Sequence, residues 1–216
     1  MKRLLNFTVA AAIAMSAASA QEIDLGPSIG VKGTVNTAVP GEGLKTGFAI
    51  NSLPDFGLTT RILFSPNSGI GMLLDLEMSG YGYLMRPENE DVADDDNSFI
   101  TRHSYVTVAP SLNLGGLTLG VGISFPTGQT TTEVDGDQSW SPTGTQASPV
   151  LDARLGAMIP LYRGKGGEFN MVIRASYMLG GHYTTEIRTY PLSPNTSNPQ
   201  SAGLVVGFNY LFRVLE

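Results

Sequence analysis

The chain contains two imidazoles, His103 and His182, and these are the side chains best suited to act as a general base beside a nucleophile. Such a pair must share one face of its element. His103 is followed directly by Ser104, and adjacent side chains of a strand point to opposite faces. His182 is followed two positions later by Thr184 rather than by a serine. The spacing therefore predicts no catalytic hydroxyl–imidazole pair, and we expect no enzymatic activity.

Carboxylates gather in residues 88–97, which carry six acids and no basic residue. Oxygen-rich loops can hold Ca²⁺ or Mg²⁺. This segment lacks the regularly spaced aspartates, the glycine and the distal glutamate of a calcium-binding loop. Because the chain has no cysteine, thiolate metal sites are excluded as well. We expect a solvated acidic loop, with no metal and no cofactor.

The first residues have the order of an export signal: a basic start, an apolar stretch from Leu4 to Met15, and small residues up to Ala20. The apolar stretch is shorter than the ~20 residues that a membrane-spanning helix needs. We expect cleavage after Ala20, which makes residues 1–20 a signal peptide and residues 21–216 the mature domain. Cleavage would remove two basic residues and no acid, so the formal charge would change from −6 to −8. An acidic product argues against nucleic acid as a partner.

The elements that position the remaining polar residues are predicted from a period of two. In residues 117–125 every second residue from Leu117 to Phe125 is apolar, and threonine, glycine or serine lies between. This pattern is typical of a strand with one apolar face. The pattern of residues 99–112 fits either phase. Eight strands are predicted, near residues 27–38, 56–65, 70–84, 99–112, 117–126, 150–162, 169–183 and 201–213.

The links between these strands alternate in length. Short links are predicted at 66–69, 113–116 and 163–167, and long ones at 39–55, 85–98, 127–149 and 184–200. Tight turns on one rim and long loops on the other are typical of outer-membrane barrels, and an even strand number leaves both chain ends on one side. The fold class predicted is all-β, an eight-stranded antiparallel up-and-down transmembrane β-barrel.

The direction of the charged rows decides between a membrane barrel and a soluble barrel with an apolar lumen. In a membrane barrel the charged rows face inward, and the interior of eight strands is just wide enough for side chains to fill. Four cations and three anions then share the lumen, which is close to neutral and favours a closed interior over a water-filled pore. The residues of this predicted lumen charge network are Lys32, Arg61, Arg154 and Arg174 with Asp75, Glu77 and Asp152.

The last strand carries a glycine followed by aromatic residues at the third and fifth positions, Gly207, Tyr210 and Phe212. This pattern resembles the C-terminal signal of bacterial outer-membrane barrels, and the resemblance implies recognition by the barrel assembly machinery. With the strand count, the mature chain resembles the porin-like eight-stranded outer-membrane barrels, akin to the membrane domain of outer-membrane protein A and to the small barrels of Bacteroidota-type bacteria. The resemblance implies the outer membrane of a Gram-negative cell envelope and contact with its lipid.

The function predicted is that of a small integral barrel with a closed or nearly closed lumen. Its role is structural, or it meets external partners through loops 85–98, 127–149 and 184–200, because exposed loops on a rigid scaffold are where binding evolves. Three alternatives stay open. They are a narrow porin-like diffusion channel, a lipid-modifying outer-membrane enzyme, and a secreted soluble barrel that binds an apolar ligand.

Overall fold

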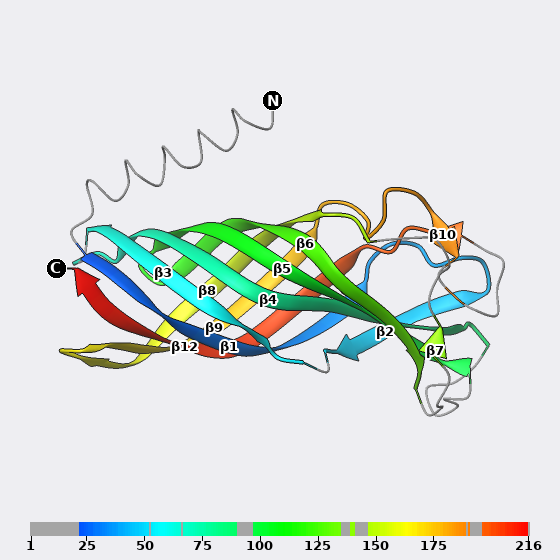
Figure 1. Ribbon diagram of the computed structural model, residues 1–216, viewed down its shortest axis with the longest axis horizontal. Helices are drawn as coiled ribbons and strands as arrows, with labels where there is room; N and C mark the ends of the chain where they lie inside the picture. Colours follow the sequence, from blue (N-terminus) through cyan, green and yellow to red (C-terminus); the bar gives the residue numbers. More distant parts are fainter. Residues whose placement is uncertain are drawn as a thin grey trace.

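The computed structural model consists almost entirely of β-strands (Figure 1). Among the described residues no helix is both long and apolar enough to span a bilayer. The predicted signal peptide lies outside the described residues. These are residues 22–51, 53–65, 67–89, 97–134, 139–140, 147–188, 190 and 196–215. The long strands are β1 (Glu22–Asn36), β3 (Asp55–Ser65), β4 (Ile70–Pro87), β5 (Phe99–Leu114), β6 (Leu117–Glu133), β8 (Val150–Gly164), β9 (Gly167–Met178) and β12 (Ser201–Leu215). The short strands are β2 (Leu44–Ile50), β7 (Ser139–Trp140), β10 (Ile187–Arg188) and β11 (Thr196–Ser197).

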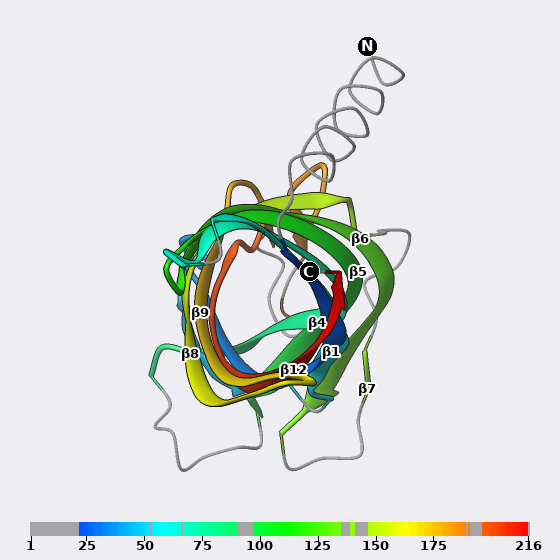
Figure 2. The same cartoon turned by 90° about the vertical axis from the view of Figure 1, so that its left-hand side faces the viewer.

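The eight long strands form a closed ring, which Figure 2 shows end-on. Each pairs antiparallel with the next long strand along the chain, in the order β1, β3, β4, β5, β6, β8, β9, β12. The ring closes where β12 pairs with β1 over twelve residues of β1, from Ile23 to Asn36 with a gap at 26–27. The prediction of an eight-stranded antiparallel up-and-down barrel is therefore confirmed.

The alternation of short and long links is also present (Figure 1). At one end, which we call the turn end, the short links follow β3, β5 and β8, and the first residues of β1 lie beside the last residues of β12. Gly69, Gly115 and Gly116 have positive φ values of 66°, 69° and 101° there, a conformation that glycine adopts without a steric penalty. The long links lie at the opposite end, which we call the loop end.

Several strands differ from the predicted ranges at their ends. β1 begins at Glu22 rather than at 27, β6 continues to Glu133 rather than ending at 126, and β9 ends at Met178 rather than at 183. Residues 127–133 are polar or small, so they lack the apolar alternation that marks the rest of β6. Alternation reports only the part of a strand whose outer face meets an apolar medium, and strand pairing continues beyond that part.

The link predicted for residues 39–55 is not irregular, because it contains β2. This strand pairs with β1 at Gly33–Val35 and with β4 at Leu44–Gly47 of its own sequence. β3 occupies the same place in the ring nearer the turn end, where it pairs with β1 up to Gly30. The wall between β1 and β4 is thus formed by β3 near the turn end and by β2 near the loop end.

The two faces of the wall differ in polarity as predicted. The apolar rows point outward and are exposed; in β6, Leu117 to Phe125 in steps of two are 37–54% exposed. The inward rows are polar and buried, as for Lys32 at 1% and Asp152 at 0% exposed. The open phase of strand 99–112 is settled as well, because His103 and Tyr105 face inward and Leu112 is half exposed.

Candidate functional site

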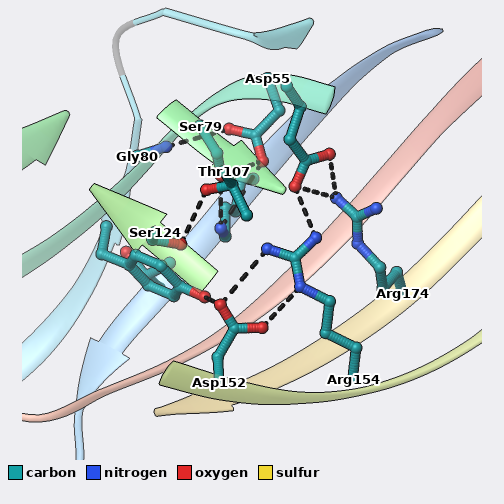
Figure 3. Close-up of polar contacts among 12 residues, drawn as sticks. Asp55, Ser79, Gly80, Thr107, Ser124, Asp152, Arg154 and Arg174 are labelled. Carbon is teal, nitrogen blue, oxygen red and sulfur yellow. Dashed lines mark hydrogen bonds and ion pairs between the residues drawn. The ribbon is translucent and has the colours of Figure 1, made fainter. Parts of the chain in front are cut away.

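Midway between the turn end and the loop end, a level that we call mid-height, the lumen holds a cluster of ion pairs (Figure 3). Arg154 of β8 contacts Glu77 at 2.6 Å and Asp152 at 2.5 Å. Arg174 of β9 contacts Glu77 at 2.7 Å and Asp75 at 3.3 Å. Since β9 is four strands from β4 in either direction around the ring, the contacts of Arg174 cross the full width of the lumen. Charged side chains therefore bridge opposite walls at this level.

Lys32 extends this cluster toward β1. Its Nζ donates to Ser79 Oγ at 2.8 Å, lies 3.6 Å from Asp55 and stands 3.7 Å from the centre of the Tyr81 ring. Ser79 Oγ in turn donates to Asp55, and the Tyr81 hydroxyl donates to Asp152 at 3.1 Å. The cation is fully buried, and its position between a carboxylate and a ring face offsets part of the cost of removing it from water.

A second cluster closes the turn end. Arg61 of β3 contacts Asp24 at 2.7 Å and Glu168 at 2.9 Å, and lies 3.7 Å from Glu22. Two outer arginines complete this cluster: Arg163 pairs with Glu168 and Arg213 with Glu22. The seven residues predicted from the sequence thus lie in two groups, with Arg61 in the turn-end cluster and the other six at mid-height.

The expected balance of four cations and three anions is corrected by the structure. Among the described residues four further acids line the lumen, and together with Asp75, Glu77 and Asp152 they make seven. Arg163 and Arg213 bring the paired cations to six. The missed acids lie at the ends of strands or just outside the predicted ranges. Each is nevertheless an even number of positions from the other inward-pointing residues of its strand, so it points inward as well. They are Glu22, Asp24, Asp55 and Glu168.

Aromatic and imidazole rings fill the lumen toward the loop end. The rings of His103 and His182 stack with centroids 4.0 Å apart. His182 Nδ1 lies 2.8 Å from the Tyr105 hydroxyl, and its Nε2 lies 2.8 Å from Ser201 Oγ. His182 follows β9 in the chain, and burial lowers the pKa of its ring well below the ordinary histidine value. The imidazole is therefore neutral at physiological pH.

The Ser201–His182–Tyr105 contacts have the order of a nucleophile, a base and an orienting group, which the spacing of the sequence did not predict. The three side chains are 0% exposed. Ser201 comes from β12, so a pairing 19 residues apart was invisible to a search for neighbours on one strand. These three side chains fill the lumen between β5, β12 and the residues that follow β9.

The other predicted sites are placed as follows. Tyr210 and Phe212 lie on the outer face of β12 with ring centroids 4.7 Å apart, and Gly207 faces Gly30 across the β1–β12 seam. Of the acidic loop, residues 90–96 lie outside the described residues, as does the side chain of Trp140. Within the described parts, no three histidine, aspartate or glutamate residues form a group that could hold a metal ion.

No protein-family model and no curated protein sequence matches the chain. Solved structures with a similar fold include the attachment invasion locus protein Ail of Yersinia pestis in complex with a heparin analogue (16% identity, 88% of this chain and 99% of that one, TM-score 0.41). They also include the outer membrane protein OprG of Pseudomonas aeruginosa (12%, 92% and 99%, TM-score 0.38). A third is the outer membrane protein AlkL, solved in lipid bilayers (10%, 91% and 92%, TM-score 0.42). Because these similarities are low, the assignment of the inward and outward faces of the wall rests on the polar and apolar rows of this barrel itself.

Proposed function

We propose that this chain is an integral protein of a bacterial outer membrane, a non-enzymatic barrel with a closed lumen that supports the envelope and presents its long loops to external partners. Apolar rows on the outer face support the membrane location. Leu119 and Leu155 lie side by side there on β6 and β8, and each is more than half exposed. Burial of such rows contributes roughly 25 cal/mol per Å² removed from water.

A soluble barrel that binds an apolar ligand would need an apolar lumen. The described lumen is lined instead by ion pairs at mid-height and at the turn end, as in the contacts of Arg154 and Arg61. Charges turned inward and apolar side chains turned outward are the arrangement that a bilayer requires. This polarity favours the membrane proposal over the soluble one.

The observation that carries the closed lumen is the contact between Arg174 and Glu77 across the ring. Beside it the lumen retains a cavity of about 50 Å³, lined in part by Asp75 and Ser111. A cavity of this size holds a few waters, and the ion pairs of Arg174 cross the lumen beside it. An ion crossing the barrel would have to displace buried charged groups, each of which costs several kcal/mol to separate from its partners.

The second candidate function is a narrow diffusion channel. A polar vestibule of about 200 Å³ at the turn end favours it, and its walls include Arg61, Arg163 and Glu168. For a channel, the mid-height cluster would have to open. Conduction would then depend on Arg154 and Arg174, and their replacement would change ion selectivity.

A planar-bilayer recording separates the two proposals. The mature chain, refolded in detergent and shown to be inserted by heat-modifiable migration on a gel, is expected to give no stable conductance steps. Large and stable steps from the inserted wild type would contradict the closed lumen and favour the channel. A change in lipid A mass on expression would overturn the non-enzymatic role.

The predicted partners are proposed on the same basis. The outer face of β12, with Tyr210 and Phe212, supports recognition of the last strand by the barrel assembly machinery. Outer-membrane lipid would surround the apolar rows. The loop-end segments are proposed as the surface that meets external molecules, because they connect the long strands at the end opposite the tight turns.

A further inference from the structure

We propose that the outer wall carries a binding groove for a phosphate-bearing glycolipid of the outer leaflet, at the place where β2 replaces β3. This inference rests on the proposed membrane location. The groove has a volume of about 140 Å³ and lies between the β2–β3 link and strands β4 and β5. Its apolar part includes Leu53, Phe56 and Met78, and its polar part includes Asn51 and Arg102.

Two glycines on the outer face of β4 make room for the polar part. A Cβ at Gly82 would meet Asn51 Oδ1 at 3.4 Å and Arg102 Cγ at 3.5 Å. A Cβ at Gly80 would meet Asn51 Nδ2 at 3.0 Å. The amide and the guanidinium stem therefore lie against the wall, next to the position where the exposed apolar rows end.

Three side-chain nitrogens of this region are donors that lack an acceptor among the described residues. Asn51 Nδ2, Arg102 Nε and Arg86 Nε are buried, and the described part of the chain offers no hydrogen-bond partner for any of them. Buried donors in proteins are nearly always satisfied, and a small movement of these side chains around an anion bound in the groove would give them the missing acceptor. Arg102 uses one Nη to donate to Thr132 at 3.3 Å, which leaves the rest of its fork available. Phosphate oxygens are the acceptors that suit such a set of donors.

A pair of like charges gives independent support. Lys45 of β2 and Arg86 of β4 are directly opposite in the register and both point outward. Lys45 Nζ donates to the Glu88 carbonyl at 2.9 Å, and like charges directly opposite on neighbouring strands still repel each other, which an anion bound beside them would relieve. Arg86 is four residues beyond Gly82, the register partner of Arg102, or roughly 13 Å along the strand. Two cationic points at this separation suit a headgroup that carries more than one phosphate.

The apolar part identifies the occupant as a lipid. Leu53 is 70% and Phe56 49% exposed, and the register places Phe56, opposite Met78, nearer the turn end than Arg102, which is opposite Gly82. An acyl chain against these side chains would continue from a phosphate held by Arg102. Because the groove lies toward the loop end, which faces outward in the proposed orientation, the lipid belongs to the outer leaflet.

The test is native mass spectrometry of the refolded mature barrel released from detergent micelles. The probes are lipid A with both phosphates, the same lipid A without phosphates, and inorganic phosphate. We expect the wild type to retain phosphorylated lipid A with an affinity about tenfold higher than that for the phosphate-free form, and Arg102→Gln to remove this preference. Asn51→Asp, which places an anion beside the phosphate, should also weaken retention.

Lys165→Gln is the matched control, because it removes one cation from the turn end and should retain phosphorylated lipid A like the wild type. Equal retention by Arg102→Gln, Asn51→Asp and the wild type would overturn the groove. Displacement of lipid A by millimolar inorganic phosphate would indicate a simple anion site and would also overturn the lipid occupant. Heat-modifiable migration is read separately: a chain that inserts without preferring phosphorylated lipid A refutes the groove alone, whereas a chain that never inserts refutes the membrane location.

Discussion

Arg154 shows why the buried charges of the lumen act as a set. Its guanidinium contacts Glu77 and Asp152, and Glu77 is shared with Arg174. Each group lost its hydration on folding and recovers that cost only through its partners. Removing one partner leaves the others charged, buried and unpaired, which is more harmful than replacing a complete set by apolar residues.

Replacement of Arg154 by alanine is expected to destabilise the folded barrel by about 3–5 kcal/mol. The physical cause is that Asp152 loses its ion pair and Glu77 loses one of two. Denaturant unfolding of the refolded protein in lipid vesicles measures the change. Arg163→Ala is the control, because Arg163 is 70% exposed and its pair with Glu168 should contribute under about 1 kcal/mol. Equal losses in the two variants would contradict the lumen network.

The neutral state of His182 predicts a pH dependence. Burial lowers the pKa of the folded ring, so below about pH 6.5 the unfolded chain binds a proton that the folded protein does not. Stability contributed by this group is present above that pH and is lost as the pH falls, by up to about 1.4 kcal/mol per pH unit. In unfolding experiments between pH 7.5 and 5, His182→Asn should give a shallower slope than the wild type. Identical slopes would show that the ring titrates freely in the fold.

Much of the lumen network could be predicted at the level of residues, because inward parity follows from the alternation of a strand. Asp24 and Asp55 were missed although they occupy inward positions, because the predicted strands began after them, at residues 27 and 56. The stacking of His103 on His182 could not be predicted at all. It joins two segments 79 positions apart, and a local pattern does not contain that pairing.

At the level of elements, the seam between β1 and β12 decides whether the sheet closes. Gly207 lies directly opposite Gly30, and a Cβ at Gly207 would approach Gly30 Cα to 2.6 Å. The nearest atoms all belong to the β1 backbone at Ile29 and Gly30, so there is no flexible side chain that could move away. Close approach of the two strands therefore requires glycine at this position.

Gly207→Val is expected to prevent closure of the ring, so the refolded sample should lack the heat-modifiable form on a gel. Gly128→Val is the matched control. It makes the same change in β6, where a Cβ would have nothing within 4 Å, and should change stability by no more than about 0.5 kcal/mol. A normally folded Gly207→Val protein would show that the seam tolerates a wider spacing.

The number and order of the long strands could be predicted because each crosses an apolar medium, which imposes a period of two on its outer face. β2 could not be predicted, because its outward face mixes Lys45 with Phe48 and Ile50. One extra residue between Lys45 and Phe48 also breaks the alternation of inward and outward side chains. The upper part of β6 was missed for a related reason. Its outward residues, such as Thr130 and Thr132, are polar, so pairing with β5 is the main sign of the strand.

At the scale of the whole molecule, the exposed apolar surface predicts how the mature chain behaves in solution. Without detergent or lipid it should aggregate, because rows such as Leu151 to Leu161 would face water. In detergent it should fold, and the unheated sample should migrate differently from a boiled one. A monodisperse folded protein in plain buffer would contradict the membrane assignment.

Because β2 continues the wall where β3 ends, the height of the wall does not depend on the length of a single strand. β3 ends its pairing with β1 at Gly30, and β2 resumes it at Gly33. The segment 37–43, between β1 and β2, can therefore become longer or shorter while the strand register nearer the turn end stays fixed. We expect an epitope inserted there to be displayed at the loop end while the strand pairing nearer the turn end stays unchanged.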